Sequence, residues 1–164
     1  MPRFWPVVAL LVLAAAGCGG AKTVVVTRTV ALEPPASQAL YGHIQSLQRR
    51  NGEWELRFDP AWFLGGVTAN TAAAEDGAVD PGQPVPNDYY IVDEGHRVLT
   101  YHVADGARVT VLVRAVKQKR ISVAELAKVL DGTSAVQLFE PLDSGVWITV
   151  RIDTVRSITQ QYLP

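Results

Sequence analysis

The sequence predicts a single α+β domain that is mainly β, in which a small barrel-like antiparallel sheet carries one capped helix and short helical turns. Alternating apolar and polar runs recur from residue 39 to the C-terminus, and such alternation is typical of half-buried strands. Gly, Asn and Asp residues separate the runs at hairpin spacing. One stretch, 122–130, has the capping residues and the apolar stripe of an amphipathic helix.

The first two strands are expected at 41–49 and 53–58. The second run alternates cleanly through Trp54, Leu56 and Phe58. Asn51-Gly52 lies between the runs, and this dipeptide is a strong signal for a type I′ hairpin turn. The alternative is a helix, because Leu40, Ile44 and Leu47 are spaced like one helix face. We prefer the hairpin, since Gly42 would weaken a helix interior.

Two helical turns and a loop are expected next. Asp59-Pro60 predicts a turn that ends at Gly65-Gly66, because aspartate caps free N–H groups and proline suits the first helical position. A second short helix fits Thr68 to Asp76, with Thr68 as its N-cap and Gly77 as its stop. Residues 77–88 contain three prolines and predict a stiff surface loop.

The remaining strands are expected at 89–92, 97–103, 108–115 and 146–153. Asp93-Glu94-Gly95 and Asp105-Gly106 supply turns between them, and 155–162 is expected to form a terminal turn or extension. Ser122 and Glu125 form a capping box for the helix at 122–130, and Gly132 follows its end. Short strands with a helix between the later ones favour an open barrel of the OB type.

Charge and cysteine content exclude several classes. The chain has 15 Lys+Arg against 16 Asp+Glu, and removing Arg3 with residues 1–17 leaves 14 against 16, a net charge of −2. Nucleic acid is therefore not an expected partner, because such proteins usually present a strongly basic face. The single cysteine, Cys18, excludes an intramolecular disulfide. No feature specifies an oligomeric state.

Residues 1–17 have the pattern of an export signal. Arg3 supplies the positive start, and the apolar run 7–16 has the length of a signal core. A membrane span needs roughly 20 apolar residues, which this run lacks. The following Ala15-Ala16-Gly17-Cys18 resembles the lipobox of bacterial lipoproteins.

That resemblance implies cleavage before Cys18 and a diacylglyceryl thioether on its sulfur, often with an acyl chain on the new amino group. Two or three acyl chains anchor a protein stably, so the expected location is the extracytoplasmic face of the cell membrane. The alternative is an ordinary secretory signal with an incidental cysteine. Gly19-Gly20 favours the lipoprotein, since a flexible start lets the domain clear the bilayer.

Residues 18–38 are expected to form the lipidated N-terminus and a flexible tether, and 39–164 the globular domain. Thr23 to Val30 alternates like a strand, but Glu33-Pro34-Pro35 stops it and no hairpin partner is near. The alternative is that Val24 to Val30 adds to a sheet edge.

A second resemblance covers most of 42–103 and, more loosely, the C-terminal strand. The runs 56–64, 73–77 and 85–91 are similar to a group of uncharacterised bacterial secreted and lipid-anchored proteins. These share a strand followed by Asp-Pro-x-x-Trp-Leu, a Glu-Asp-Gly turn and an Asn-Asp-Tyr-Tyr-Ile strand. The resemblance implies a shared domain and no established activity. Here Phe63-Leu64 stands where the group has Trp-Leu.

No catalytic, cofactor-binding or metal-binding residue is assigned. The histidines His43, His96 and His102 are too few and too scattered for a zinc site without thiols. The chain lacks a Gly-x-Ser-x-Gly elbow and a phosphate-cradling glycine loop. Acids do cluster from Asp76 to Glu94, which leaves a carboxylate hydrolase as the alternative function. Helix ends and turns explain the same acids.

Two surface features are binding candidates. One is an aromatic patch of Trp62, Asp88, Tyr89 and Tyr90, although the same rings could pack the core. The other is the basic stretch Arg114, Lys117, Lys119 and Arg120, which could contact anionic lipid headgroups or wall polymers, or form a solvated loop. A third possibility is a ligand inside the barrel, enclosed between Trp54 and Trp147.

The expected function follows by elimination. The sequence favours a lipid-anchored envelope protein whose small β-rich domain binds or positions an envelope protein or polymer. Its membrane contact would be the lipid on Cys18, and it would need no cofactor. The alternative is a small extracytoplasmic hydrolase that uses carboxylates around Asp76 to Glu94.

Overall fold

A computed structural model of the chain describes residues 36–95 and 97–164. The expected signal, Cys18, the 24–30 segment and His96 lie outside the described residues. Pro35–Pro164 forms one compact unit. Among the described helices, none has both the length and the apolar character that a membrane span requires.

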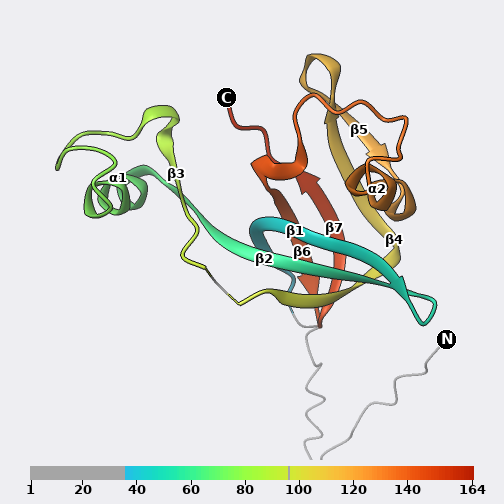
Figure 1. Cartoon of the computed structure of the whole chain (residues 1–164). Coiled ribbons are helices and arrows are strands. Elements are labelled where there is room, and N and C mark those ends of the chain that lie inside the picture. The colour runs from blue at the N-terminus through green and yellow to red at the C-terminus, as the bar shows by residue number, and fades with distance from the viewer. Residues whose placement is uncertain (1–35, 96) are drawn as a thin grey trace, which may run out of the picture. The chain divides into compact units, whose positions relative to one another are not determined.

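Five strands close into a barrel (Figure 1). In ladder order they are β1 (Gln38–Arg50), β2 (Glu53–Gly65), β4 (Leu99–Val113), β7 (Thr154–Gln160) and β6 (Val146–Arg151), which pairs back with β1. Only β4 and β7 pair in parallel. This is the strand order of an OB barrel, and α2 (Val123–Leu130) lies in the connection between the third and fourth barrel strands. The predicted α+β barrel-like fold is confirmed.

Apolar side chains fill the barrel. Leu56 and Phe58 of β2 are fully buried, as are Val109 of β4 and Ile148 of β6. Helix α2 packs Val123 and Leu126 against the same core. Trp54 packs against this core as well, whereas Trp147 lies in a separate aromatic cluster described below. The two tryptophans therefore do not enclose a ligand.

The first hairpin is confirmed, but its second strand is longer than predicted. Asn51 and Gly52 have φ of 52° and 87°, as a type I′ turn requires. The predicted helical turn at Asp59-Pro60 is wrong, because β2 continues to Gly65 and Pro60 pairs with Gly42. At Pro60 the other edge of β2 has no partner strand, since the pairing of β2 with β4 stops at Phe58 and its pairing with β3 starts at Trp62. A missing N–H therefore costs no ladder hydrogen bond there.

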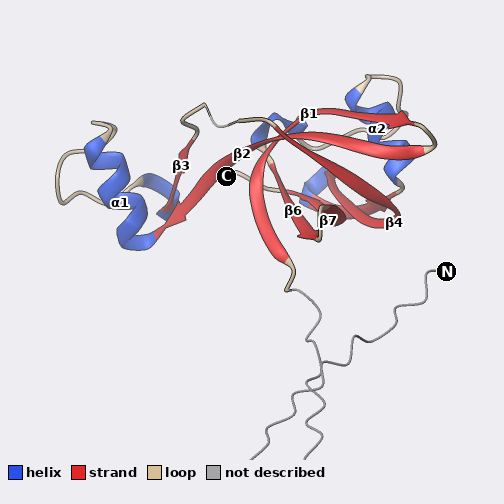
Figure 2. Cartoon of the chain, turned by 90° about the horizontal axis from the view of Figure 1, so that it is seen from below, coloured by secondary structure: helices blue, strands red, loops and turns tan. Residues whose placement is uncertain are grey.

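Beyond the barrel, residues 61–94 form an arm (Figure 2). It consists of the end of β2, α1 (Gly66–Glu75), a loop with a 3₁₀ turn at Pro86–Asp88, and β3 (Tyr89–Val92). The predicted bounds of β3 are confirmed. Helix α1 begins two residues before the predicted cap, after Gly65, which offers no side-chain cap. The arm has a core of its own, in which Ala69, Ala73 and Val85 are buried.

The strands β5 (Lys117–Ile121) and β7 were not predicted, and the two strands predicted at 97–103 and 108–115 form a single strand. Residues 99–113 form the continuous β4, so the expected turn at Asp105-Gly106 is wrong. The strand continues because β7 pairs with it on both sides of an irregularity between Val103 and Arg108. The 114–120 stretch, expected as a loop, contains β5, and the expected terminal turn is β7.

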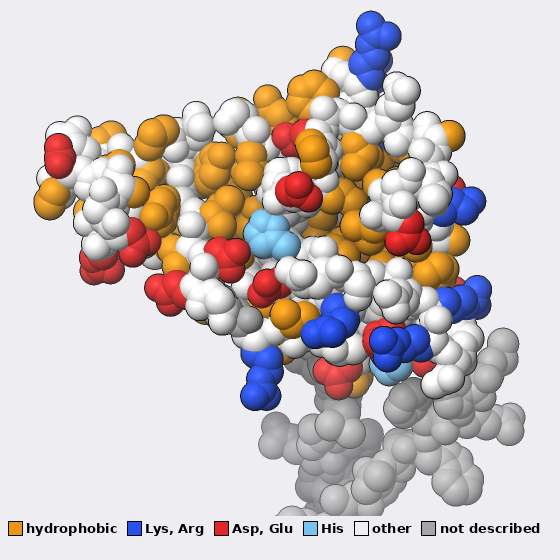
Figure 3. All heavy atoms as spheres, viewed as in Figure 1, with side chains coloured by type: hydrophobic (Ala, Val, Ile, Leu, Met, Phe, Trp, Pro, Cys, Tyr) orange, Lys and Arg blue, Asp and Glu red, His pale blue; other side chains and the backbone are white. Residues whose placement is uncertain are grey.

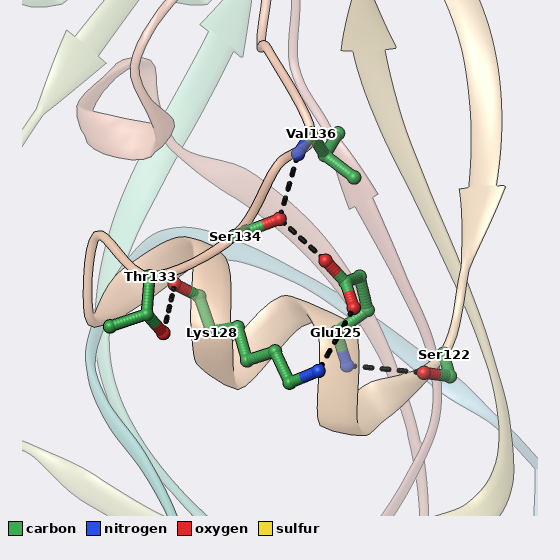
Figure 4. Close-up of polar contacts among 6 residues, drawn as sticks. All are labelled: Ser122, Glu125, Lys128, Thr133, Ser134 and Val136. Carbon is green, nitrogen blue, oxygen red and sulfur yellow. Dashed lines mark hydrogen bonds and ion pairs between the residues drawn. The ribbon is translucent and has the colours of Figure 1, made fainter.

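The predicted N-cap of α2 is confirmed, but the Glu125 side chain makes other contacts than those of a capping box (Figure 4). The Glu125 backbone N–H donates to Ser122 Oγ at 3.1 Å. The Glu125 carboxylate instead accepts from Ser134 Oγ at 2.5 Å and pairs with Lys128 Nζ at 3.6 Å. The Ser134 hydrogen bond, with Lys128 and Lys119, lowers the pKa of Glu125. These contacts hold the segment around Ser134, which follows α2, against the helix.

Candidate functional site

The predicted aromatic patch is divided between two faces of the arm. The β2–β3 register pairs Trp62 with Val92 and Leu64 with Tyr90. Since alternate residues of a strand face opposite sides, Trp62 and Tyr90 share one face and Tyr89 lies on the other. Trp62 is 60% exposed, and Asp88 is exposed in the turn before β3. The structure therefore does not gather the four residues on one surface.

Tyr89 belongs to an aromatic cluster that joins the arm to the barrel. Phe63 stacks on Tyr89 with ring centroids 5.0 Å apart, and it contacts Tyr41 at 5.0 Å and Trp147 at 5.6 Å. The Tyr41 hydroxyl donates to the Ser144 carbonyl at 2.6 Å, and Tyr41 is only 2% exposed. Burial, with smaller effects of Tyr89 and Asp93, raises the Tyr41 pKa to about 12. This cluster packs two parts of the molecule together.

The acids of the arm do not converge on a catalytic centre. Asp76 accepts a hydrogen bond from the Tyr90 hydroxyl at 3.0 Å, and this bond raises the pKa of Tyr90. A shallow hollow of about 510 Å³ beside α1 includes Glu75 as its only acid. Among residues 36–95 and 97–164, no three His, Cys, Asp or Glu side chains are close enough together to hold a metal ion.

A groove of about 430 Å³ lies on the barrel itself. Three strands form it, and its lining comprises Glu53 and Trp54 of β2, His102, Val103, Ala104 and Asp105 of β4, and Thr154 and Arg156 of β7. OB barrels bind oligonucleotides and oligosaccharides on the face of their second and third strands, beside the loops that join strands one to two and four to five. Here β2 and β4 are the second and third barrel strands. Asn51-Gly52 and Ile152-Asp153 are the two loops.

The groove lining is polar and carries both signs of charge. His102 Nδ1 lies 3.3 Å from Glu53 Oε2, and the His102 backbone N–H donates to the Asp153 carbonyl at 3.1 Å. Arg49 lies over the Trp54 ring at 5.7 Å. The groove lining thus combines two carboxylates, an imidazole, a hydroxyl and a guanidinium with the Trp54 ring, which suits a ligand with many hydroxyl or amide groups.

Sequence reasoning did not find this groove. It considered His102 only as a metal ligand, and it assigned Thr154 and Arg156 no role. The local signal is the alternation of 53–58, which places Glu53 and Glu55 on the face opposite Leu56. That signal identifies an outer face and does not show that β7 lies beside it.

No protein family, curated protein or solved structure matches this chain. The strand order and the position of α2 nevertheless define it as an OB-type barrel with an added arm. The two resemblances seen in the sequence stay predictions.

Proposed function

We propose that this protein is a lipid-anchored component of the bacterial envelope whose barrel binds a glycan segment of an envelope polymer without catalysis. The observation that carries this proposal is the polar groove of β2, β4 and β7, because it occupies the ligand position of OB barrels. Oligosaccharide is favoured over nucleic acid because the chain has a net charge of −1.

Binding is favoured over catalysis because the ionisable groups of the groove are well solvated. The side chains of His102 and Glu53 are 63% and 74% exposed. Catalytic acids and bases need burial or close charges to tune their pKa values, and exposed ion pairs interact weakly. These solvated groups therefore favour hydrogen bonding to a ligand over acid–base catalysis.

The groove is tested with N-acetylchitotetraose as the probe, titrated calorimetrically into the chain from residue 18 carrying Cys18→Ser. We expect Arg156→Ala to weaken binding about tenfold, the size of one lost charge-assisted hydrogen bond. Arg57→Ala is the matched control, since Arg57 is exposed on β2 outside the groove. Equal affinities for the two variants, or no binding by the parent chain, would contradict the groove assignment.

The anchor is tested separately in bacteria that express the full chain. We expect the parent protein to fractionate with membranes and to incorporate labelled palmitate. Cys18→Ser should remove both properties, because the thioether requires the Cys18 sulfur. A Cys18→Ser protein that stayed membrane-bound and normally processed would exclude the lipid anchor and leave the groove proposal intact.

A further inference from the structure

Positive charge is concentrated in one segment of the barrel. Residues 108–121 contain five of the chain's 15 Lys+Arg and no Asp or Glu, and we call this segment the basic hairpin. It consists of the second half of β4, a turn at Arg114–Val116 and β5. All five cations, Arg108, Arg114, Lys117, Lys119 and Arg120, are exposed.

The register divides these cations between two faces. Lys119 pairs with Val111 and Lys117 with Val113, and residues opposite each other share a face. Both lysines therefore lie on the core side, where Lys119 helps to lower the pKa of Glu125 after the larger effects of Ser134 and Lys128. Arg120 pairs with Thr110 and lies on the outer face. Arg108, two residues from Thr110, shares that face.

An exposed aromatic pair borders the outer face. The Phe139 N–H donates to the Leu112 carbonyl at 2.8 Å, and Leu138 bridges to Val113. The 138–139 segment thus continues along β4 where β7 ends. Leu138 packs against the core, and the Phe139 backbone lies beside Leu112 of β4. Phe139 and Tyr162 are 46% and 39% exposed, with ring centroids 6.1 Å apart.

We propose that the basic hairpin and the Phe139–Tyr162 pair bind an anionic polysaccharide. The arginines contact carboxylate or phosphate groups of the polymer, for which the guanidinium fork is well shaped. The aromatic pair stacks against its sugar rings. Neither Cys18 nor the groove is needed for this binding.

A polymer fits this surface better than a bilayer. The turn between β4 and β5 presents one large apolar residue, Val116, which is 37% exposed, whereas the cations extend along both strands. The turn also lies far from the point where the chain enters the barrel. Gln38 pairs with Val150, Val150 pairs with Val155, and Val155 pairs with Val103. The chain therefore enters the barrel at the His102 end of β4. The register against β7 places Arg108 only two strand positions beyond Val103. His102 and Val113 are therefore about eight strand positions apart, or roughly 26 Å.

The charge of the arm is opposite to that of the basic hairpin. In Figure 3 the arm, on the left, carries Asp and Glu side chains, while Lys and Arg side chains lie on the top, the right and the lower rim, with further Asp and Glu side chains among them. Residues 61–94 contain six acids and no Lys or Arg. An anionic polymer is therefore attracted to the basic hairpin and repelled by the arm.

The test uses the chain from residue 18 carrying Cys18→Ser, with alginate as the anionic polysaccharide and dextran as the neutral one. We expect binding to alginate alone, weakened about tenfold or more by Arg114→Gln with Arg120→Gln. The control pair, Arg57→Gln with Arg97→Gln, removes the same charge from exposed positions elsewhere and should leave the affinity unchanged. Phe139→Ala should weaken binding without changing its salt dependence. Thermal unfolding verifies that each variant is folded.

Three results would overturn the proposal. One is an absence of alginate binding by the parent chain. Another is an equal loss in the two charge pairs, which would show that only net charge matters. The third is tighter binding to vesicles with 30% phosphatidylglycerol than to alginate at the same salt concentration, which would identify a membrane as the occupant.

Discussion

The arm and the basic hairpin are opposites in charge and in construction. The arm has six acids and no Lys or Arg, and the basic hairpin has five cations and no acid. The basic hairpin extends a barrel strand, so its Val109 and Val111 are buried in the main core. The arm leaves the barrel after Pro60 and relies on a separate core in which Ala69, Ala73 and Val85 are buried.

The two regions obtain their stability from different cores. Alanines bury little apolar area, and stabilisation scales with that area at roughly 25 cal/mol per Å². The core of the arm is therefore weak by itself, and the aromatic cluster of Tyr41, Phe63, Tyr89 and Trp147 supplies its main attachment. We expect the arm to open before the barrel unfolds, since weakly packed units open at lower free energies.

The largest effect is expected from Gly42→Ala, which acts where the arm leaves the barrel. A Cβ on Gly42 would lie 2.8 Å from the Pro60 Cα and would collide with the Asp59 carbonyl oxygen, and neither backbone atom can move without displacing β2. We expect the free energy of unfolding to fall by about 3 kcal/mol. Urea unfolding followed by tryptophan fluorescence measures it.

Gly106→Ala is the matched control on the strand that leads to the basic hairpin. A Cβ there meets no atom within 4 Å, and its φ is not in the left-handed region. Its effect should stay below about 0.5 kcal/mol. Similar losses of stability for the two variants would contradict the view that β1 and β2 approach too closely at Gly42 to admit a side chain.

A smaller effect is expected from the titration of Tyr41. Its pKa is raised from 10.0 to about 12 in the folded protein, so the folded state holds the proton more tightly than the unfolded chain. The resulting stability is complete below pH 10 and is lost as the pH rises toward 12. The loss is at most about 2.5 kcal/mol. Tyr41→Phe should abolish this component, as measured by urea unfolding at pH 8 and pH 11.5.

Tyr90→Phe and Tyr101→Phe separate Tyr41 from the other tyrosines whose pKa values are raised. Tyr90 also has a raised pKa, but its hydroxyl contacts Asp76 on the exposed side of the arm. Each of these variants should keep most of the alkaline loss seen in the parent protein. If Tyr41→Phe kept the loss as well, the aromatic cluster would not be the part of the molecule that senses alkaline pH.

The elements predicted correctly are those set by residues that are close together in the sequence. Asn51-Gly52 forms the expected turn, Ser122 caps α2, and β3 has the expected bounds. The failures lie where distant strands override a local signal. Asp59-Pro60 resembles a helix start but pairs with β1, and Asp105-Gly106 resembles a turn but lies within β4 beside β7.

The candidate site was harder to predict for the same reason. Glu53, His102 and Arg156 come from three strands that are far apart in the chain. Only the parallel pairing of β4 with β7 places Arg156 near His102. The expected aromatic patch was divided because neighbouring residues of a strand face opposite sides, and a run such as Tyr89-Tyr90 cannot place both rings on one surface.

The parallel pairing of β4 and β7 also determines when the barrel can form during synthesis. The strand β7 (Thr154–Gln160) is the last of the five barrel strands in chain order. Until it is made, β4 and β6 both lack a partner along one edge, and the core between them stays open to water. Closure of the barrel is therefore a late and non-local event, and folds dominated by such contacts assemble slowly.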